Sequence, residues 1–254
     1  MTDILKLQNG SDIRGIACEG VAGEDVNLTE EAGNRIGGGF VKWLSDKKGK
    51  KAEELRIGIG HDSRITADSL FAAAAKGIVA AGAKVYDCGL VSTPSMFMTT
   101  VFEEFQFDGS IMITASHLPF NRNGYKFFDR DGGLEHDDIT KILETAAELK
   151  VQEADLSQVE KVDSISVYCA FLQDKIKKSI NAADYDKPLA GVHIVVDTGN
   201  GAGGFFVEKV LNPLGADTAG SQFLEPDGRF PNHIPNPENK EAMESIRQAV
   251  LQNK

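Results

Sequence analysis

Short apolar runs alternate with longer helical patterns along the whole chain. Residues 55–62 place isoleucines among glycines and end in a histidine and an aspartate, which predicts a strand followed by a polar loop. Residues 66–82 then predict a helix, because Thr66 is suited to cap it, the alanines favour it, and Gly82 is suited to end it. The alanine-rich face of this helix indicates close packing on a sheet.

The same alternation continues to the end of the sequence. Strands are further predicted at residues 84–89, 109–116, 124–128, 191–199 and 216–225, and helices from about residue 93 and at residues 135–150, 166–180, 201–214 and 236–253. A polar stretch after Lys150 marks a domain boundary. Alternating strands and helices indicate α/β architecture with parallel or mixed sheets. We therefore predict two tandem α/β domains with mixed sheets flanked by helices, at residues 1–155 and 156–254.

Composition limits the classes of partner. Hydrophobic residues make up 41% and charged residues 26% of the 254 residues, which is typical of globular domains. The net charge of −11 argues against a nucleic-acid or anionic-membrane surface, although a local basic pocket for a small phosphate is compatible with it. No apolar run approaches the ~20 residues that span a bilayer. We therefore expect neither a nucleic acid nor a membrane as partner.

The three cysteines, Cys18, Cys88 and Cys169, lie far apart and match no metal-binding or redox spacing. An odd, scattered set is typical of reduced thiols, so we expect a cytoplasmic protein. The N-terminal residues lack the basic and apolar blocks of a signal peptide, and an organelle reached after removal of a transit peptide stays an alternative.

The strand predicted before Ser116 ends in Thr-Ala-Ser-His, at the carboxyl end where α/β sheets bind ligands. The ordinary interpretation is a turn serine that bonds its own backbone. A hydrolase triad is disfavoured, because no Gly-x-Ser-x-Gly surrounds the serine and neighbours in an extended chain, such as Ser116 and His117, point oppositely. The other hypothesis is a serine that carries a phosphoryl group, whose nearly two negative charges need cations. His117, Arg122 and Lys126 supply them within ten residues of sequence.

Two further arginines follow or accompany acidic residues. Arg14 lies two positions after Asp12 and directly before Gly15. Asp62 and Arg64 follow a predicted strand. Taken singly, each pair predicts a surface or inter-element salt bridge worth about 0–1 kcal/mol. Only their combination with the serine segment favours a site.

Gly199, Gly201 and Gly204 form Gly-x-Gly-x-x-Gly between a predicted strand and a predicted helix, with Glu225 further on. This spacing is that of the dinucleotide fingerprint. Asp197, however, lies where the phosphates would be, and few strands follow to complete a dinucleotide fold. A tight strand-to-helix turn is the favoured interpretation.

Residues 225–238 combine acidic residues with His233 and four prolines. The carboxylates and the imidazole are metal-ligand types, but no pair of them has helical or hairpin spacing. A rigid, proline-rich loop that leads into the last helix is favoured instead.

Together these stretches resemble the α-D-phosphohexomutase superfamily, which comprises phosphoglucomutase, phosphomannomutase and phosphoglucosamine mutase. The matches run in order across nearly the whole chain: Ile13 to Gly15, Gly60 to Arg64, Thr114 to Pro119, Asn123 to Lys126, Val196 to Gly203, and Pro226 to Asn232. The serine loop, Thr114 to Pro119, is the most specific of them. The resemblance implies an enzyme that moves phosphate between O1 and O6 of a hexose through a hexose bisphosphate intermediate.

The resemblance also implies roles for four residues. Ser116 would be phosphorylated and act as the phosphoryl donor, and Lys126 and Arg14 would supply positive charge or proton transfer, with His117 beside them. Mg²⁺ would bind a phosphate oxygen on Ser116, together with aspartates that this chain does not contain. The substrate implied is a hexose phosphate such as glucose or mannose phosphate.

The sequence departs from the family pattern in two places. Leu118 stands where the family has asparagine, and the chain ends at Lys254 before the family's aspartate-rich metal loop. We therefore expect the first half of a four-domain mutase, whose partners are the remaining C-terminal domains, and no activity from this half alone. The alternative from another class is a catalytically silent sugar-phosphate-binding or regulatory protein that keeps the mutase fold.

Overall fold

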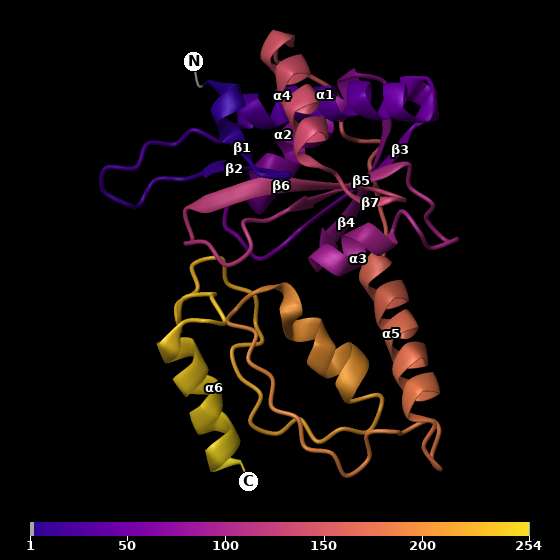
Figure 1. The fold of residues 1–254 in the computed structure, drawn as a ribbon, viewed down its shortest axis with the longest axis vertical. Coiled ribbons are helices and arrows are strands. Elements are labelled where there is room, and N and C mark those ends of the chain that lie inside the picture. The colour runs from indigo at the N-terminus through magenta and orange to yellow at the C-terminus, as the bar shows by residue number, and fades with distance from the viewer. Residues whose placement is uncertain (1–2, 254) are drawn as a thin grey trace. The chain divides into compact units, whose positions relative to one another are not determined.

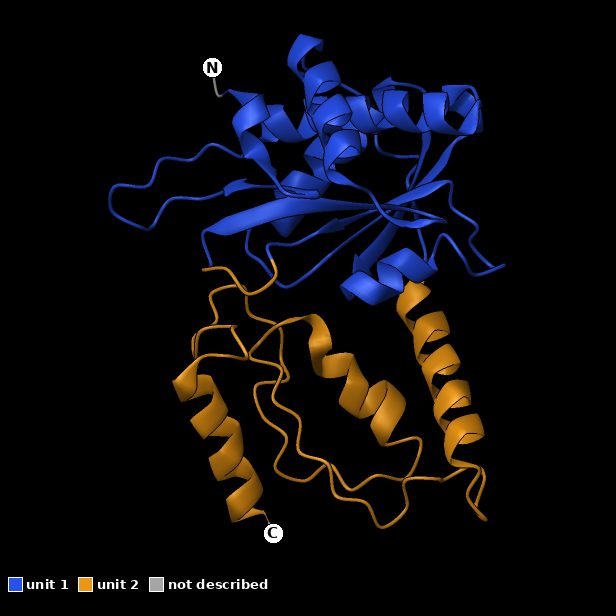
Figure 2. Cartoon of the chain, viewed as in Figure 1, with its two compact units in different colours: residues 1–115, 120–162 blue, residues 116–119, 163–254 orange. Residues whose placement is uncertain are grey.

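The computed structural model describes residues 3–253 and divides the chain into two compact units (Figure 2). Unit 1 contains residues 1–115 and 120–162, and unit 2 contains residues 116–119 and 163–254. The terminal residues of the two predicted domains, 1 and 254, lie outside the described residues.

Unit 1 is built on one mixed sheet of eight strands. The strands are β1 (Gln8–Asn9), β2 (Asp12–Ile16), β3 (Arg56–His61), β4 (Lys84–Leu90), β5 (Gly109–Ile113), β6 (Arg122–Asp129), β7 (Gly132–Gly133) and β8 (Glu160–Lys161). They lie in the order β1-β2-β6-β5-β3-β4-β8, and β7 pairs with β6. β3 pairs in parallel with β4 and with β5, and β4 pairs in parallel with β8. The remaining pairs, β1–β2, β2–β6, β5–β6 and β6–β7, are antiparallel.

Helices cover both faces of this sheet. They are α1 (Glu30–Lys48), α2 (Ala67–Ala80), α3 (Thr93–Met98) and α4 (His136–Glu148), with the short 3₁₀ helices Ile4–Leu7 and Ala52–Glu54. α1, α2 and α4 lie on one face of the sheet, and α3 lies on the other (Figure 1). Helix α1 packs against both α2 and α4. The α/β architecture predicted from the sequence is confirmed in this unit.

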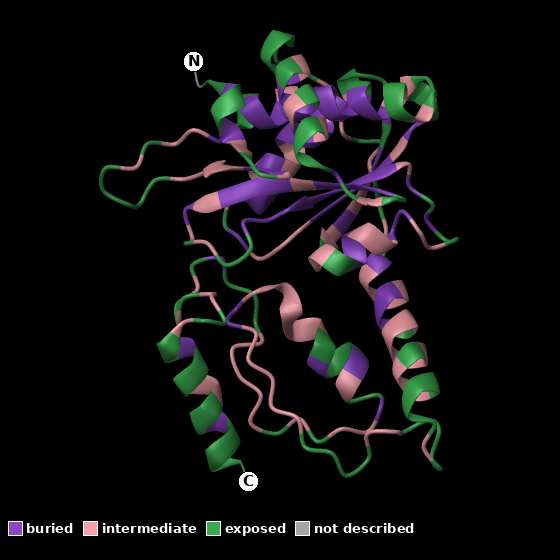
Figure 3. Cartoon of the chain, viewed as in Figure 1, coloured by how far each residue is buried: buried purple, intermediate pink, exposed green. Residues whose placement is uncertain are grey.

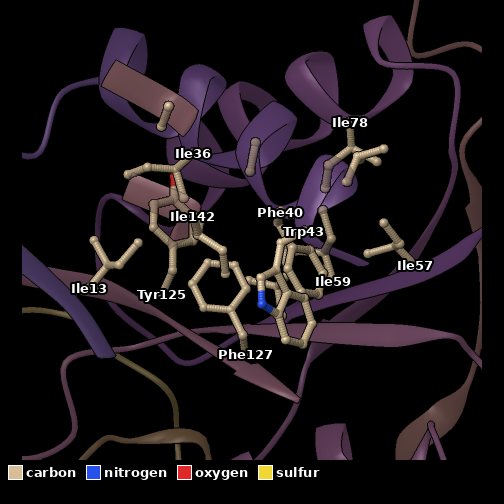
Figure 4. Packing of buried hydrophobic residues seen from close by; sticks show 14 of the residues in the cluster. Ile13, Ile36, Phe40, Trp43, Ile57, Ile59, Ile78, Tyr125, Phe127 and Ile142 are labelled. Atoms are coloured by element: carbon tan, nitrogen blue, oxygen red, sulfur yellow. The ribbon is translucent and has the colours of Figure 1, made fainter. Parts of the chain in front are cut away.

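The core of unit 1 lies between the sheet and α1, α2 and α4 (Figure 4). Phe40 of α1 and Phe127 of β6 are both fully buried, with ring centroids 4.8 Å apart. The ring of Tyr125 is buried beside them, and its hydroxyl donates to the Leu70 carbonyl oxygen at 3.0 Å. Burial of the phenol raises its pKa. Aromatic side chains on β6 thus anchor the central antiparallel strand to the helical layer.

Helix α1 was not among the helices predicted, and its residues 37–39 are three consecutive glycines, which have low helix propensity. The structure shows why they stand there: a Cβ on Gly37 would lie 2.3 Å from the Ala74 carbonyl oxygen of α2, and one on Gly77 would lie 1.9 Å from the Asn34 carbonyl oxygen of α1. The two helices therefore cross with their backbones in close contact, which side chains would prevent. The α1–α2 packing compensates for the low helix propensity.

The other elements predicted for unit 1 are confirmed with small shifts of their ends. The strands expected at residues 55–62, 84–89, 109–116 and 124–128 are β3 to β6. Thr66 occupies the N-cap of α2 but makes no capping hydrogen bond; its hydroxyl accepts from the Asn123 amide at 2.9 Å instead. Helix α4 ends two residues before Lys150, so that lysine does not lie in its last turn.

Unit 2 has less regular structure than its sequence pattern indicates. Its helices are α5 (Ser164–Ile180), the 3₁₀ turn Ala202–Gly204, the π-helical turn Val207–Leu211 and α6 (Lys240–Gln252). The segments expected as strands, residues 191–199 and 216–225, run parallel to each other but make only the isolated bridges His193–Asp217 and Asp197–Gln222. Among the described residues no third segment pairs with them, and a lone pair of strands is marginal.

The helix predicted over residues 201–214 is likewise broken into a 3₁₀ and a π turn. Three glycines among its first four residues oppose a regular helix, because glycine lacks side-chain contacts and loses more backbone freedom. The small core of unit 2 gathers Cys169, Val210 and Leu214. Figure 3 accordingly shows mainly half-buried and exposed positions in this unit, whereas unit 1 is buried along its central strands and helices.

Candidate active site

The serine segment, which is the serine loop Thr114 to Pro119 of the sequence, follows β5 directly along the chain. The backbone nitrogen of Thr114 donates to the Gly124 carbonyl oxygen at 3.0 Å, and the Thr114 hydroxyl donates to Asp62 Oδ2 at 2.6 Å. Ala115 is fully buried, and the next residue, Ser116, is exposed. Unit 1 therefore fixes the chain up to the residue before the serine.

Ser116 itself has a left-handed backbone, with φ of 55°. Such a conformation costs a residue other than glycine about 1–3 kcal/mol and persists only where the surroundings impose it. It also brings the Ser116 hydroxyl oxygen within 3.3 Å of Nδ1 of His117. The expectation that these neighbouring side chains point oppositely is wrong, because it assumed an extended chain at Ser116.

The loop after β3 supports the residues before the serine. The Asp62 carboxylate accepts three hydrogen bonds. One comes from the Thr114 hydroxyl, and two come from Arg64, whose backbone nitrogen lies at 3.0 Å and whose Nε lies at 3.2 Å. The Arg64 side chain is fully buried, and Nη1 donates to the Arg122 carbonyl oxygen at 2.9 Å. Desolvation lowers the pKa of Arg64, and the charge of Asp62 opposes this effect.

Of the two kinds of salt bridge expected for Asp62 and Arg64, surface or inter-element, the structure shows the inter-element kind, because the Arg64 side chain is fully buried. The pair ties the ends of β3 and β5 to the start of β6. Breaking a buried pair leaves an unpaired charge, which costs about 3–5 kcal/mol. Its position indicates that it holds the serine segment rather than binds a ligand.

Two cations share one carboxylate on the neighbouring strands. Asp12 at the start of β2 accepts from Nη2 of Arg14 at 2.8 Å and from Nζ of Lys126 at 2.5 Å. Asp12 is 7% exposed as a whole residue, and the side chains of Arg14 and Lys126 are 21% and 28% exposed. The Arg14 Nε is buried and bonds no atom of the described residues. The cluster thus keeps unused donors suited to an anion.

The sheet register brings this cluster close to the serine segment. Arg14 pairs with Gly124 in the β2–β6 ladder, and the Thr114 nitrogen bonds to the same Gly124. Adjacent strands lie about 4.8 Å apart. Thr114, which follows β5, and Arg14 of β2 are therefore both neighbours of Gly124 within unit 1. The structure thus brings Arg14 and Lys126 together on Asp12.

Arg122, predicted as a third cation for a phosphate, is occupied elsewhere. Its Nη2 donates to Glu24 Oε1 at 2.5 Å, and the other oxygen of Glu24 accepts from the Asn121 amide at 2.7 Å. Both charged side chains of this pair are about 30% exposed. The pair fastens the loop before α1 to the start of β6, so Arg122 is not a free phosphate ligand.

The glycine-rich stretch of unit 2 forms a tight turn, as favoured from the sequence. Gly199 and Asn200 are both left-handed, with φ of 53° and 62°, and the Gly199 nitrogen donates to Asp197 Oδ1 at 2.9 Å. The Gly201 nitrogen closes the turn on the Thr198 carbonyl oxygen at 2.8 Å. The Asp197 carboxylate occupies the turn, so the amides there do not form an open anion cradle.

The proline-rich loop is fastened to this turn through His233. Its Nε2 lies 3.1 Å from both carboxylate oxygens of Asp197, and its Nδ1 lies 2.9 Å from the Ile234 carbonyl oxygen. Desolvation lowers the pKa of His233, but the bonds to Ile234 and Asp197 outweigh it and leave the pKa raised. This histidine is thus a structural bridge between two loops.

The described residues contain no group of three or more histidine, cysteine, aspartate or glutamate side chains placed to hold a metal ion. Within the same residues, 3–253, no helix is long and apolar enough to cross a membrane. None of the three cysteines forms a disulfide bond, and burial raises the pKa of Cys18 and Cys169. Thiolate chemistry is therefore disfavoured at these positions.

Comparison with known proteins identifies the family. Residues 5–153 match the family model for phosphoglucomutase/phosphomannomutase α/β/α domain I, and residues 168–254 match that for domain II. A phosphomannomutase of Escherichia coli is 32% identical over 242 residues, or 91% of this chain and 48% of the relative. A phosphoglucosamine mutase of Caldicellulosiruptor saccharolyticus is 31% identical over 216 residues, or 84% and 44%.

A solved structure shares the fold. The chain aligns with a phosphoglucomutase/phosphomannomutase family protein from Burkholderia thailandensis with a TM-score of 0.73 and 25% identity, over 99% of this chain and 50% of that one. The chain thus spans about half the length of the relatives it matches. The resemblance noted in the sequence is confirmed, and the chain belongs to the phosphoglucomutase/phosphomannomutase family.

Proposed function

We propose that this chain is the N-terminal half of a phosphohexomutase that interconverts hexose 1-phosphate and hexose 6-phosphate, with Ser116 as the phosphoryl carrier. The observation that carries the proposal is the cluster of Arg14 and Lys126 on the strands beside the serine segment, with an unused buried donor on Arg14. A phosphoserine bears about −1.5 to −2 charges at neutral pH and three acceptor oxygens. The cluster has the charge and donors that such a group requires.

In the proposed cycle the O6 hydroxyl of a hexose 1-phosphate attacks phosphorus on Ser116. The P–Oγ bond breaks as the O6–P bond forms, the O6 proton passes to a base of the site, and Ser116 recovers a proton at Oγ. The resulting hexose bisphosphate turns around and returns its O1 phosphate to Ser116 by the reverse chemistry. Phosphoryl transfer has a loose transition state, so the residues act chiefly by positioning and charge stabilisation.

Each residue has a defined part in this proposal. Lys126 and Arg14 balance the charge of the transferring group, and donors aimed at developing charge are worth about 10²–10³ in turnover. His117 Nδ1 lies 3.3 Å from Ser116 Oγ, which supports the proposal that it takes or gives the serine proton. The strained backbone of Ser116 holds the hydroxyl in the exposed position that a sugar can reach.

Mg²⁺ is the proposed cofactor. This chain fits it only in part, because its described residues hold no carboxylate cluster for a metal, and the ligand that it offers is the phosphate on Ser116. When bound, the ion would polarise the phosphorus and neutralise oxygen charge. Its carboxylate ligands would come from C-terminal domains, which we propose as partners because the relatives are about twice as long as this chain.

The proposal is tested on the full-length protein by mutase assay and peptide mapping. We expect one phosphate on the peptide that contains Ser116, absent in Ser116→Ala, and a loss of turnover by orders of magnitude in that variant. A phosphate on another peptide, or full turnover in Ser116→Ala, would contradict the proposal. A protein that binds hexose phosphates without turnover would be the silent, regulatory alternative that Leu118 in the serine loop suggests.

Lysine variants test the cation cluster against a matched surface charge. Lys126→Ala should lower turnover far more than Lys150→Ala, because Lys126 belongs to the cluster and Lys150 is exposed beyond the end of α4. Circular dichroism and thermal unfolding control for folding. Equal effects of the two substitutions would remove Lys126 from the site.

A further inference from the structure

One carboxylate organises both cations of the proposed site. Asp12 Oδ1 accepts from Lys126, and Oδ2 accepts from Arg14, so each oxygen serves a different partner. We propose that Asp12 is a positioning residue of the mutase: it orients Lys126 and Arg14, and it balances their charge while Ser116 carries no phosphate. This inference rests on the proposed function.

The strand geometry places the three side chains on one face. Asp12 and Arg14 are two residues apart on β2, so their side chains point to the same side of the sheet. The β2–β6 register pairs Ile13 with Tyr125, and one step further along this ladder Asp12 faces Lys126. The contact between Asp12 and Lys126 is therefore set by the strand pairing and does not depend on a flexible loop.

The residue opposite Arg14 leaves room for its side chain. Gly124 faces Arg14 in the ladder, and a Cβ there would lie 3.1 Å from Cγ of Arg14 and 2.2 Å from the Ile13 carbonyl oxygen. A side chain at position 124 would thus displace the arginine. The glycine permits the close approach that keeps Arg14 on Asp12.

Charge over the proposed cycle explains what the carboxylate contributes. With Ser116 unphosphorylated, the charges of Arg14, Lys126 and Asp12 sum to +1; with a phosphoserine of about −2 the total is about −1. Without Asp12 the corresponding sums would be +2 and about 0. The two cations alone would therefore retain the phosphate on Ser116, whereas Asp12 makes transfer to the sugar and back more nearly balanced.

Orientation is the second contribution. A lysine ammonium on a flexible stem loses its place readily, and misplacing a catalytic group by about 1 Å can cost about 10²-fold in rate. Asp12 is 7% exposed, so water competes little for its oxygens. The donors that remain free on Lys126 and the unpaired Nε of Arg14 are then directed by the bonds to Asp12.

The test uses Asp12→Asn in the full-length protein, with Asp129→Asn as the matched control. Asp129, at the other end of β6, is also a buried carboxylate paired with a lysine, Lys48, at 3.0 Å. The exposed fractions of the side chains alone are similar in the two pairs: 10% and 28% for Asp12 and Lys126, and 5% and 24% for Asp129 and Lys48. Asp129→Asn thus controls for the loss of a buried lysine–carboxylate pair, while Asp12→Asn additionally loses the pair with Arg14.

We expect Asp12→Asn to lower kcat by about 10- to 100-fold, the range for removing a group that orients a ligand residue. KM should change less, and Asp12→Glu should restore part of the loss. Asp12→Asn should also shift the equilibrium between phosphoenzyme plus hexose phosphate and free enzyme plus hexose bisphosphate toward the phosphoenzyme. A purely structural carboxylate would not move this equilibrium. Asp129→Asn should leave both kcat and the equilibrium unchanged in the folded protein.

The outcomes separate failure of the proposed function from failure of the role proposed for Asp12. If the wild-type protein has neither mutase activity nor a phosphate on Ser116, the proposed function fails before Asp12 is considered. If wild type is active and Asp12→Asn keeps its kcat and its phosphorylation equilibrium, the inference is overturned. It is also overturned if Asp12→Asn and Asp129→Asn lose activity only in proportion to their folded fraction. Should Asp12→Asn fail to fold, Asp12→Glu supplies the same two measurements.

Discussion

Replacing Gly77 of α2 with alanine tests the close packing of α1 and α2. An alanine Cβ at this position would lie 1.9 Å from the Asn34 carbonyl oxygen and 2.8 Å from its carbonyl carbon. Ordinary contacts begin near 3.4 Å, so two helix backbones must separate by more than 1 Å. Overpacking of this kind costs about 1–3 kcal/mol, and here the neighbour is backbone and cannot rotate away.

Helix propensity acts in the opposite direction. Alanine is favoured over glycine inside a helix by about 1 kcal/mol. Because a backbone neighbour places the overpacking cost in the upper part of its range, about 2–3 kcal/mol, we expect Gly77→Ala to lower the free energy of unfolding by about 1–2 kcal/mol net. Gly38→Ala on α1 is the control, because its Cβ would meet the flexible end of Leu149 at 3.0 Å, a side chain that is 38% exposed. Gly38→Ala should be neutral or stabilising by up to about 1 kcal/mol.

The assay is urea unfolding of the 254-residue chain followed by Trp43 fluorescence. The sequence contains one tryptophan, and it lies on α1, 7% exposed, so its signal reports unfolding of unit 1. Midpoints are compared at unchanged m-values, since a changed m-value indicates a change in the unfolded or native state. A Gly77→Ala variant as stable as wild type, or a Gly38→Ala variant equally destabilised, would refute the close approach of the two helices.

Two further predictions concern buried polar groups. Tyr125→Phe should lower the free energy of unfolding by about 1 kcal/mol in the same Trp43 assay, because it removes the bond to the Leu70 carbonyl oxygen; no loss would contradict that bond. For His233 the folded pKa is raised, so its stabilising contribution is complete below the unfolded pKa near 6.5 and is lost as pH rises through the folded value. Thermal unfolding of wild type and His233→Gln should therefore differ more at pH 6 than at pH 8.5, and a pH-independent difference would contradict the bridge to Asp197.

Much of the fold follows from apolar periodicity. The alternation of β3, α2, β4, α3, β5 and β6 is visible in the sequence because β3 and β5 are short, almost wholly buried apolar runs and helical patterns lie between the strands. Helix α1 escaped prediction, since local propensity argues against Gly37 to Gly39 and only the contact with α2 explains them. Strand pairing in unit 2 was also overestimated, because an apolar run does not show whether a neighbouring strand exists.

Part of the candidate site could be predicted from the sequence. The serine segment and the cations Arg14 and Lys126 could be proposed from motif chemistry, but Asp12 could not be recognised as their common partner. It lies 114 residues from Lys126 along the chain, and only the β2–β6 pairing brings them together. The available signal was the Asp-x-Arg spacing within a strand, which places Asp12 and Arg14 on one face. Likewise, nothing local showed that Glu24 would occupy Arg122.

The central claim, that Ser116 transfers its phosphate to a hexose phosphate, is tested most directly by a single-turnover label experiment. Full-length protein labelled with ³²P on its serine is mixed with unlabelled hexose 1-phosphate and stopped at successive times. We predict that label leaves the Ser116 peptide at the rate at which labelled hexose bisphosphate appears, and that it then enters hexose 6-phosphate. Label that stays on Ser116 while unlabelled substrate is converted would contradict the account.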